Sequence, residues 1–236
     1  FDTVNPPVEQ VYNGAAVESL TNIEIGGPLD EWTTYYWQVI ASNDDFTTEG
    51  PVWQFDTVLP PGLVEIGTDT TSNSTTGHPT PYGTYYKNHR VQYLVLASEL
   101  TDFPGFINNV AFNVEALNNC SPMPNYRIRM KHTDQTELTT TFEVGDYVQV
   151  WQDDLFMPVT GWNQHQFTTP FEWDGESNVL IDVVYDLVDD YTQNASVYYT
   201  ATTGLNTSIY FRSDTQPADQ ATTGTTSNNR ANMLLE

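Results

Sequence analysis

The run of residues Thr168–Leu187 constrains the fold more than any other stretch of the chain. Its centre is the dipeptide Asp174-Gly175, which adopts the positive φ angles of a tight turn at little steric cost. In the second half of the run, Asn178–Tyr185, apolar side chains recur at every second position. That period is typical of a β-strand with one face toward a core. We therefore predict a β-hairpin whose opposite face, carrying Asp182, is partly exposed to solvent.

Signals of the same kind recur along the chain beyond residue 62. Short runs with alternating apolar residues are separated by Gly, Pro, Asn and Asp, and no segment has the period of a helix. About eight strands separated by such turns are typical of a jelly-roll sandwich. We therefore predict an all-β fold built from antiparallel sheets. The other strands expected in this part are Tyr85–Ala97, Ile107–Val114, Asn125–Thr133, Phe142–Trp151, Trp162–Thr168, Ser196–Ala201 and Thr207–Ser213.

A proline pair divides the chain into two predicted domains. Residues 59–62 contain Pro60-Pro61, which lacks two backbone donors and stiffens the joint between the domains. Residues 63–236 form the predicted jelly-roll sandwich. Residues 1–58 contain too few strands to close a sandwich, so we expect them either to need a neighbouring domain of the same polypeptide or to have lost their first strands to processing or disorder. The strands expected before the joint are Phe1–Val4, Val17–Ile25, Thr33–Ser42 and Val52–Val58.

The charge of the chain excludes several classes of partner. Of its 236 residues, 31 are acidic and 7 are basic, which gives a formal net charge of -24. A field of this sign repels the phosphates of nucleic acids and anionic membrane surfaces. No run of eighteen apolar residues is present, so membrane insertion is not expected. The abundance of Thr, Asn, Tyr and Trp is instead typical of an extracellular β protein.

The first domain contains a set of aromatic and turn residues at characteristic places: Leu29, Thr34-Tyr35-Tyr36-Trp37-Gln38-Val39, Ala41, Asn43, Gly50-Pro51 and Trp53-Gln54-Phe55-Asp56-Thr57. In these residues the domain resembles the C-terminal part of a fibronectin type III domain. The resemblance implies a truncated sandwich of that type.

The second domain contains short motifs spread over nearly its whole length: Ile66-Gly67-Thr68, Pro81-Tyr82-Gly83, Ala111-Phe112-Asn113-Val114, Tyr126-Arg127-Ile128-Arg129-Met130-Lys131-His132-Thr133, Gly161-Trp162-Asn163, Pro170-Phe171-Glu172-Trp173-Asp174-Gly175 and Tyr210-Phe211-Arg212-Ser213-Asp214. In these motifs it is similar to a module that accompanies fibronectin type III repeats in large secreted and cell-surface proteins of the Bacteroidetes, many of them exported by the type IX system. The resemblance implies an extracellular or cell-surface location.

Three of the seven basic residues stand in one row. Arg127, Arg129 and Lys131 alternate along a predicted strand and therefore share one of its faces. One hypothesis makes this row a site for an anion or carboxylate. The other, which we favour, pairs the row with acidic side chains of a neighbouring strand, such as Asp182 and Asp186.

Acidic residues in loops suggest a structural metal. Calcium binds six to eight oxygen ligands and tolerates irregular loops, and Asp69 with Asp214 is the first pair that we expect to supply them. A solvated acidic surface is the alternative interpretation. The only cofactor predicted is therefore Ca²⁺.

Aromatic residues near predicted loops suggest a surface for carbohydrate. Sugar rings stack on exposed aromatic faces, and neighbouring Asn, Asp and Thr side chains satisfy the sugar hydroxyls. Tyr82, Tyr85 and Trp151 are the predicted ligand-binding residues, whereas Trp162 and Trp173 flank strands and are expected in the core.

No motif with catalytic spacing is present. The four histidines lack metal-binding spacing, no serine lies in a Gly-x-Ser-x-Gly context, and the single cysteine, Cys120, is expected to be a buried, inert thiol. We therefore predict a non-catalytic extracellular module of a large bacterial surface or secreted protein, acting in adhesion, in glycan binding or as a structural spacer. The alternative is an accessory, non-catalytic region of a secreted peptidase or glycoside hydrolase. A hydrolase within the chain itself would need a deep cleft with two facing carboxylates.

Overall fold

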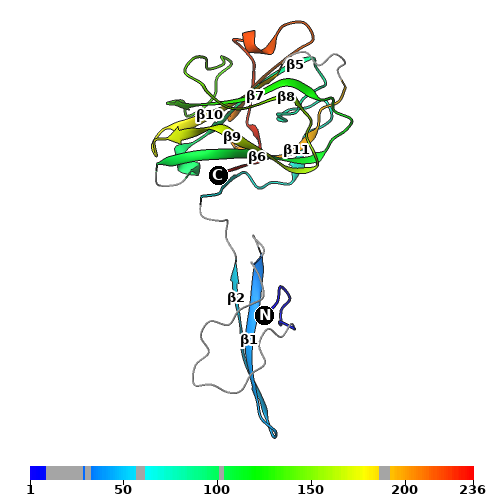
Figure 1. Cartoon of the computed structure of the whole chain (residues 1–236), viewed down its shortest axis with the longest axis vertical. Coiled ribbons are helices and arrows are strands. Elements are labelled where there is room, and N and C mark those ends of the chain that lie inside the picture. Colours follow the sequence, from blue (N-terminus) through cyan, green and yellow to red (C-terminus); the bar gives the residue numbers. More distant parts are fainter. Residues whose placement is uncertain (9–28, 30–32, 57–61, 101–103, 186–191) are drawn as a thin grey trace. The chain divides into compact units, whose positions relative to one another are not determined.

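The chain folds into two compact units, Phe1–Pro61 and Gly62–Glu236, in a computed structural model (Figure 1). The structure describes residues 1–8, 29, 33–56, 62–100, 104–185 and 192–236. The expected strand Val17–Ile25 and the Pro60-Pro61 joint lie outside the described residues.

The described part of the first unit is a two-stranded antiparallel sheet. Strand β1 (Thr34–Ser42) pairs with β2 (Thr47–Asp56), and Asp2 forms a single bridge to Tyr36 beside them. The buried ring of Tyr35 contacts the rings of Phe1 and Phe55, with centroids 4.9 Å and 5.8 Å away, and those two rings lie 6.0 Å from each other. This aromatic stack is the core of the described part of the unit.

The second unit consists of two antiparallel sheets. The first is six-stranded, in the order β13-β12-β5-β10-β7-β8. In the second, β6 pairs with β9 along one edge and with β11 and β15 along the other, while β3 pairs with β15, and β4 and β14 pair with β11. The strands of the first sheet are β5 (Asn88–Val95), β7 (Met123–Thr133), β8 (Val148–Phe156), β10 (Asn178–Tyr185), β12 (Ser208–Ser213) and β13 (Thr225–Ser227). Those of the second are β3 (Val64–Ile66), β4 (Thr71–Ser72), β6 (Gly105–Ala116), β9 (Gly161–Trp173), β11 (Ser196–Ala201), β14 (Asn229–Ala231) and β15 (Met233–Leu235).

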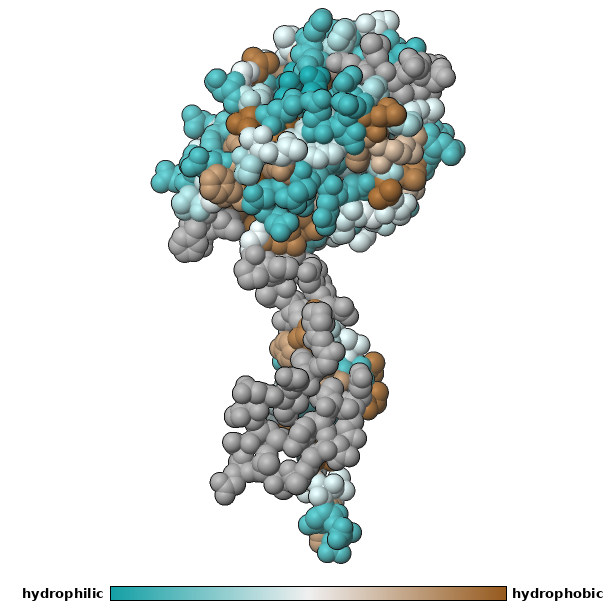
Figure 2. Space-filling view, viewed as in Figure 1, coloured by the Kyte–Doolittle hydropathy of each residue, from teal (hydrophilic) through white to brown (hydrophobic). Residues whose placement is uncertain are grey.

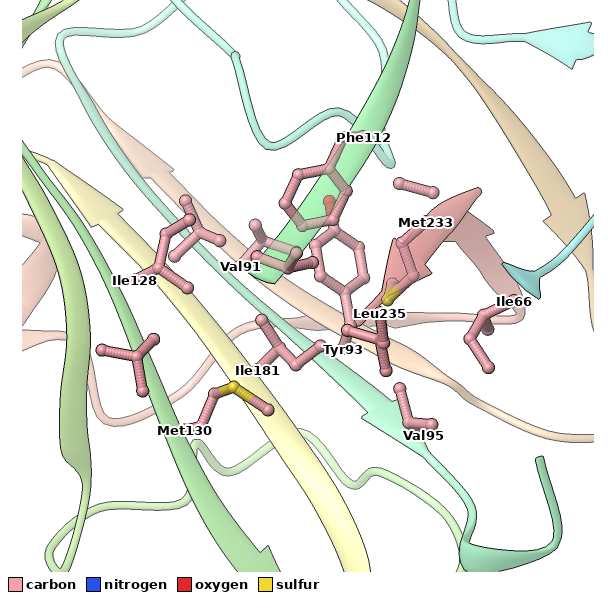
Figure 3. Packing of buried hydrophobic residues seen from close by; sticks show 14 of the residues in the cluster. Ile66, Val91, Tyr93, Val95, Phe112, Ile128, Met130, Ile181, Met233 and Leu235 are labelled. Carbon is pink, nitrogen blue, oxygen red and sulfur yellow. The ribbon is translucent and has the colours of Figure 1, made fainter. Parts of the chain in front are cut away.

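The main core lies between these two sheets. Tyr93 from β5 and Phe112 from β6 point toward each other across it, with ring centroids 5.7 Å apart (Figure 3). Met233 from β15 and Ile181 from β10 belong to the same cluster. The predicted fold class, an all-β chain with an antiparallel sandwich, is confirmed. Helical structure among the described residues is confined to two short 3₁₀ turns, η1 (Ala97–Glu99) and η2 (Ala218–Gln220).

The predicted hairpin around Gly175 is wrong, although the turn itself is present. Strand β9 pairs with β6 in one sheet, whereas β10 lies between β5 and β7 in the other. The Asp174 carboxylate accepts hydrogen bonds from the backbone N–H groups of Glu176 and Ser177, at 2.9 Å and 2.8 Å, and Gly175 has a φ of 83°. The turn therefore carries the chain from one sheet to the other, because both strands bury apolar side chains in the space between the sheets.

Strand β10 is buried on both faces, which corrects the expectation that Asp182 is partly exposed. Leu180, Asp182 and Val184 are completely buried on the side that faces away from the main core. Leu180 belongs to a second, smaller hydrophobic cluster with Leu138, Phe142 and residues of β5 and β12. The segments 134–147 and 214–224, the latter with η2, cover this outer face of the six-stranded sheet (Figure 1).

The strand expected at Phe142–Trp151 begins instead at Val148. Phe142 is buried in the outer cluster, and the next residues cannot extend because Gly145 and Asp146 both have positive φ angles, of 74° and 55°. Phe142 thus covers the outer face of the six-stranded sheet and is not part of a strand in it.

An irregular segment, Pro79–Gly83, is held in the core by buried tyrosine hydroxyls. Tyr93 donates to the carbonyl of Pro79, Tyr126 to that of Pro81 at 3.4 Å, and Tyr185 to that of Gly83. Buried carbonyls in a segment without strand partners need such donors. The three hydroxyls therefore replace the ladder that a strand would have.

Candidate functional site

A cluster of ion pairs lies on the outer face of the six-stranded sheet. Its centre is Asp182 on β10, which is completely buried. Arg90 donates to Asp182 Oδ1 through Nε at 2.7 Å, and Gln92 does so through Nε2 at 2.9 Å. Arg129 binds Oδ2 through Nε at 2.8 Å and a terminal nitrogen at 2.5 Å. These four hydrogen bonds give both oxygens of the buried carboxylate polar or charged partners, which offset part of the cost of removing it from water.

Cross-strand register explains why these residues meet. Asp182 on β10 lies opposite Gln92 of β5 on one side and Arg129 of β7 on the other. The pairing of the cation row with Asp182, which we favoured from the sequence, is confirmed for Arg129. Asp186 lies outside the described residues.

A second carboxylate, Asp219 in η2, joins the cluster from the covering segment. Its two oxygens bind Arg127 at 2.8 Å and Arg129 at 3.0 Å. Partial burial alone would raise the pKa of Asp219, but the Arg129 and Arg127 guanidinium groups outweigh that effect and hold the pKa below its usual value. Lys131, the last cation of the row, binds Glu143 at 2.8 Å.

The strand edge next to Arg127 forms a shallow, open pocket of about 360 Å³. It is lined by Asn125 and Arg127 from β7 and by Gln149 and Gln152 from β8. Arg127 lies opposite Gln152 in the strand register, and Gln149 donates to Gln152 Oε1 at 2.9 Å. Asn125 has a φ of 50°, a left-handed conformation that Asn adopts more readily than most residues. We call this the Arg127 pocket.

The Arg127 pocket offers amide donors and acceptors around one cation. Asn125, Gln149 and Gln152 are exposed, while the Arg127 side chain is 23% exposed. The two glutamines were not predicted as site residues. Their signal in the sequence is weak, because the irregular register between Ile128 and Arg129 decides which side chains of β8 face outward.

A second shallow pocket lies at the other end of the cation row. It is lined by residues 131–135 and Glu143. Glu143 occupies it, since its carboxylate binds Lys131 at 2.8 Å and the Gln135 amide at 2.6 Å. The polar groups of this pocket therefore mainly bind each other, which makes the Arg127 pocket the better candidate for a ligand.

The predicted aromatic residues do not form one surface. Tyr82 is completely buried, and its hydroxyl lies 2.8 Å from His165 Nε2, so its ring offers no face to a ligand. Trp151 is half-buried and packs against Tyr126 and His165 on the core side of β8. Tyr85 is 37% exposed and contacts the ring of Tyr86 edge-on. Of the three predicted residues, only Tyr85 therefore presents an exposed ring on which a sugar could stack.

The acidic residues predicted to bind calcium make separate contacts. The backbone N–H of Asp69 donates to Thr200 at 3.0 Å, whereas an Asp214 oxygen accepts from the backbone N–H of Lys87 at 3.2 Å. Across the described ranges, no three His, Cys, Asp or Glu side chains are grouped so that they could hold a metal ion.

His89, His165 and Cys120 are buried. Burial lowers the pKa of both His89 and His165 to about 3, and it raises the pKa of the Cys120 thiol to about 11. The thiol is 5% exposed, as expected for a cysteine with a structural position. These groups belong to the packed interior and not to a cleft.

The exposed face of the second unit shown in Figure 2 is mainly hydrophilic, with hydrophobic residues in small groups. Within the described residues, no helix has the length and apolar character needed to cross a bilayer. Comparison with family models, curated proteins and solved structures found no match to the chain.

Proposed function

We propose that this chain is a non-catalytic, glycan-binding module of an extracellular or cell-surface bacterial protein, and that the Arg127 pocket receives the sugar. The single observation that carries this proposal is the lining of the pocket, three side-chain amides around one guanidinium on two paired strands. Amides both donate and accept hydrogen bonds, as sugar hydroxyls do. An open, shallow pocket also suits one unit of a longer glycan, whose neighbours extend into solvent.

The ion pairs that hold Arg127 in place support this role. Arg127 is held by Asp219, and Asp219 is held by Arg129, which is itself fixed by the buried Asp182. Side chains locked in this way lose less conformational entropy when a ligand binds. The extracellular location rests on the composition and on the resemblance to surface modules described above.

A glycan array tests the proposal directly. The full chain is applied with and without Ca²⁺, which also tests the calcium prediction. The double variant Gln149→Ala and Gln152→Ala should lose most of the signal, because it removes both β8 amides from the pocket. Gln164→Ala is the matched control, since Gln164 is an exposed glutamine on β9 of the other sheet. Absence of binding to any glycan under both conditions would leave only the spacer role.

A further inference from the structure

Arg212 on β12 is held by groups of a different kind from those that hold most cations of the chain. Its Nη1 donates to the carbonyl of Thr76 at 2.7 Å, and its Cζ lies over the rings of Tyr86 and Tyr210, at 5.3 Å and 4.7 Å from their centroids. In the part of the chain that the structure describes, Arg212 forms no ion pair with a carboxylate. The basic residues that do so are Arg90, Arg127, Arg129, Lys131 and Arg230.

The guanidinium of Arg212 keeps donors for a ligand. Arg212 is half-buried, and the bond to Thr76 is the one hydrogen bond that its side chain makes with the described residues. None of its nitrogens is among the buried side-chain atoms that lack a partner, so the remaining N–H groups reach solvent. A planar guanidinium with free N–H groups can bind a carboxylate through two parallel hydrogen bonds. The two tyrosine rings restrict the side chain, which lowers the entropy that it loses on binding.

The neighbours of Arg212 do not cancel its charge. His89 lies opposite it in the strand register, and the ring of His78 stacks on Tyr210 at 4.0 Å. Burial lowers the pKa of both imidazoles, and the Arg212 charge lowers both further, so they are neutral at pH 7. The formal charges of Lys87 and Asp214, which adjoin the ends of β5 and β12, offset each other. An anion at this place therefore meets one local positive charge.

An exposed aromatic ring lies beside this cation. Tyr85 is 37% exposed, and its ring meets that of Tyr86 edge-on, with centroids 5.3 Å apart. Its backbone N–H donates to Oδ1 of the buried Asn194 at 2.9 Å, which fixes the position of the residue. Tyr86 thus connects the exposed ring of Tyr85 to the guanidinium of Arg212. We call Tyr85, Tyr86 and Arg212 the Arg212 corner.

We propose that the Arg212 corner is a second glycan-binding site, selective for uronic acids, in which Arg212 binds the carboxylate and the sugar ring stacks on Tyr85. The apolar C–H face of a pyranose packs on an aromatic ring, while the acidic group needs a cation within reach. The overall negative charge of the chain does not prevent this, since the Debye length at physiological ionic strength is about 8 Å and distant carboxylates are largely screened.

The Arg212 corner is separate from the Arg127 pocket. Arg212 is on β12, and β5 and β10 lie between that strand and β7, which carries Arg127. The two side chains also point to opposite faces of the sheet. Arg212 lies opposite His89, which shares the core-facing side of β5 with Val91, whereas Arg127 shares the outer face with Arg129. This inference therefore does not depend on sugar binding at the Arg127 pocket.

The test compares oligogalacturonate with its methyl ester by isothermal titration calorimetry on the full chain. The ester keeps the rings and hydroxyls and removes the charge. We expect the acid to bind about tenfold more tightly, because a hydrogen bond to a charged partner adds roughly that factor.

Three variants identify the residues of the Arg212 corner. Arg212→Gln should remove the preference for the acid while the ester still binds. Arg212→Lys keeps the charge without the planar fork and should retain only part of the preference. Tyr85→Ala should weaken acid and ester alike, by about fivefold, because both stack on the ring. Circular dichroism shows whether each variant is folded, and Tyr85→Ala changes an exposed side chain, so it serves even if Arg212→Gln does not fold.

Two controls separate this site from other sources of charge. Lys131→Gln removes one positive charge on the outer face of β7 and should leave the preference unchanged. The double variant Gln149→Ala and Gln152→Ala alters the Arg127 pocket and should also leave it unchanged. If the preference is lost in that double variant and kept in Arg212→Gln, the acid binds at the Arg127 pocket and the inference is wrong.

The remaining outcomes are equally decisive. Equal affinity for acid and ester, or binding of neither, would overturn the inference, whereas the proposed function at the Arg127 pocket is judged separately by neutral glycans on the array. Poly-glutamate that binds as tightly as oligogalacturonate would show that charge alone is recognised, which contradicts a sugar site.

Discussion

Mild acid should destabilise the second unit because two histidines are buried in neutral form. His165 is completely buried, as is His89, and burial lowers the pKa of each to about 3 from a usual value near 6.5. These two imidazoles therefore allow the unfolded chain to bind up to two more protons than the folded chain at pH values between 6.5 and 3, and His78, whose pKa burial also lowers well below its usual value, adds to that difference. When the unfolded state binds more protons, the free energy of unfolding falls as the pH falls.

The size of the effect follows from the two pKa values. Each pH unit below 6.5 removes about 1.4 kcal/mol per histidine, so acidification to pH 5 removes about 2 kcal/mol for each and about 4 kcal/mol for the pair. That loss is a large fraction of the stability of an ordinary domain, about 5–15 kcal/mol. Most carboxylates titrate below pH 5, so the range from pH 7.5 to pH 5 isolates the histidines.

Urea unfolding at pH 7.5 and pH 5, with His165→Gln as the comparison, measures this loss. Glutamine keeps a hydrogen-bonding partner for the Tyr82 hydroxyl but takes up no proton. The variant should lose about 2 kcal/mol less than the parent chain on acidification, and any contribution of the first unit cancels in this difference. Equal losses in the two proteins, or an NMR titration that finds the His165 imidazole protonated at pH 5 in the folded state, would refute the reasoning.

Three further predictions concern single positions. Asp182→Asn should lower the free energy of unfolding by roughly 3–5 kcal/mol in urea, because two guanidinium groups lose their buried partner; a loss under about 1 kcal/mol would contradict this account of the cluster. Gly175→Ala should lower the free energy of unfolding by about 1–3 kcal/mol, because φ is 83° and the new Cβ would lie 3.0 Å from Pro104 atoms. The control is Gly105→Ala, because the space around Gly105 is open. Cys120 should react with a thiol reagent at pH 7.5 only as fast as the unit opens, and fast labelling of the folded protein would argue against a buried thiol.

Local features of the fold were predictable from the sequence, whereas strand partners were not. The turn at Gly175 depends on four consecutive residues, and the alternating residues of β10 depend only on their spacing. The partner of each strand depends on burial throughout the unit, so the same turn joins two sheets when a hairpin was expected. Exposure of the outer face of β10 was mispredicted because segments 134–147 and 214–224, which cover it, carry no periodic signal.

The candidate site was predictable only in its charges. The spacing of Arg127, Arg129 and Lys131 places them on one face, and that placement held. Tyr82 was expected at the surface because Pro and Gly surround it, a composition typical of loops. It is buried because three tyrosine hydroxyls from strands bind the carbonyls of its segment. Contacts of this kind join distant residues and leave no pattern in one sequence.

The anchoring of Pro79–Gly83 sets a limit on how this chain can vary. Loops usually accept insertions and deletions because few of their backbone groups have fixed partners. Here, three carbonyls are matched to hydroxyls on β5, β7 and β10, so a change of one residue in length would shift every later carbonyl away from its donor. Without regular secondary structure, these five residues are nonetheless as fixed in length as a central strand.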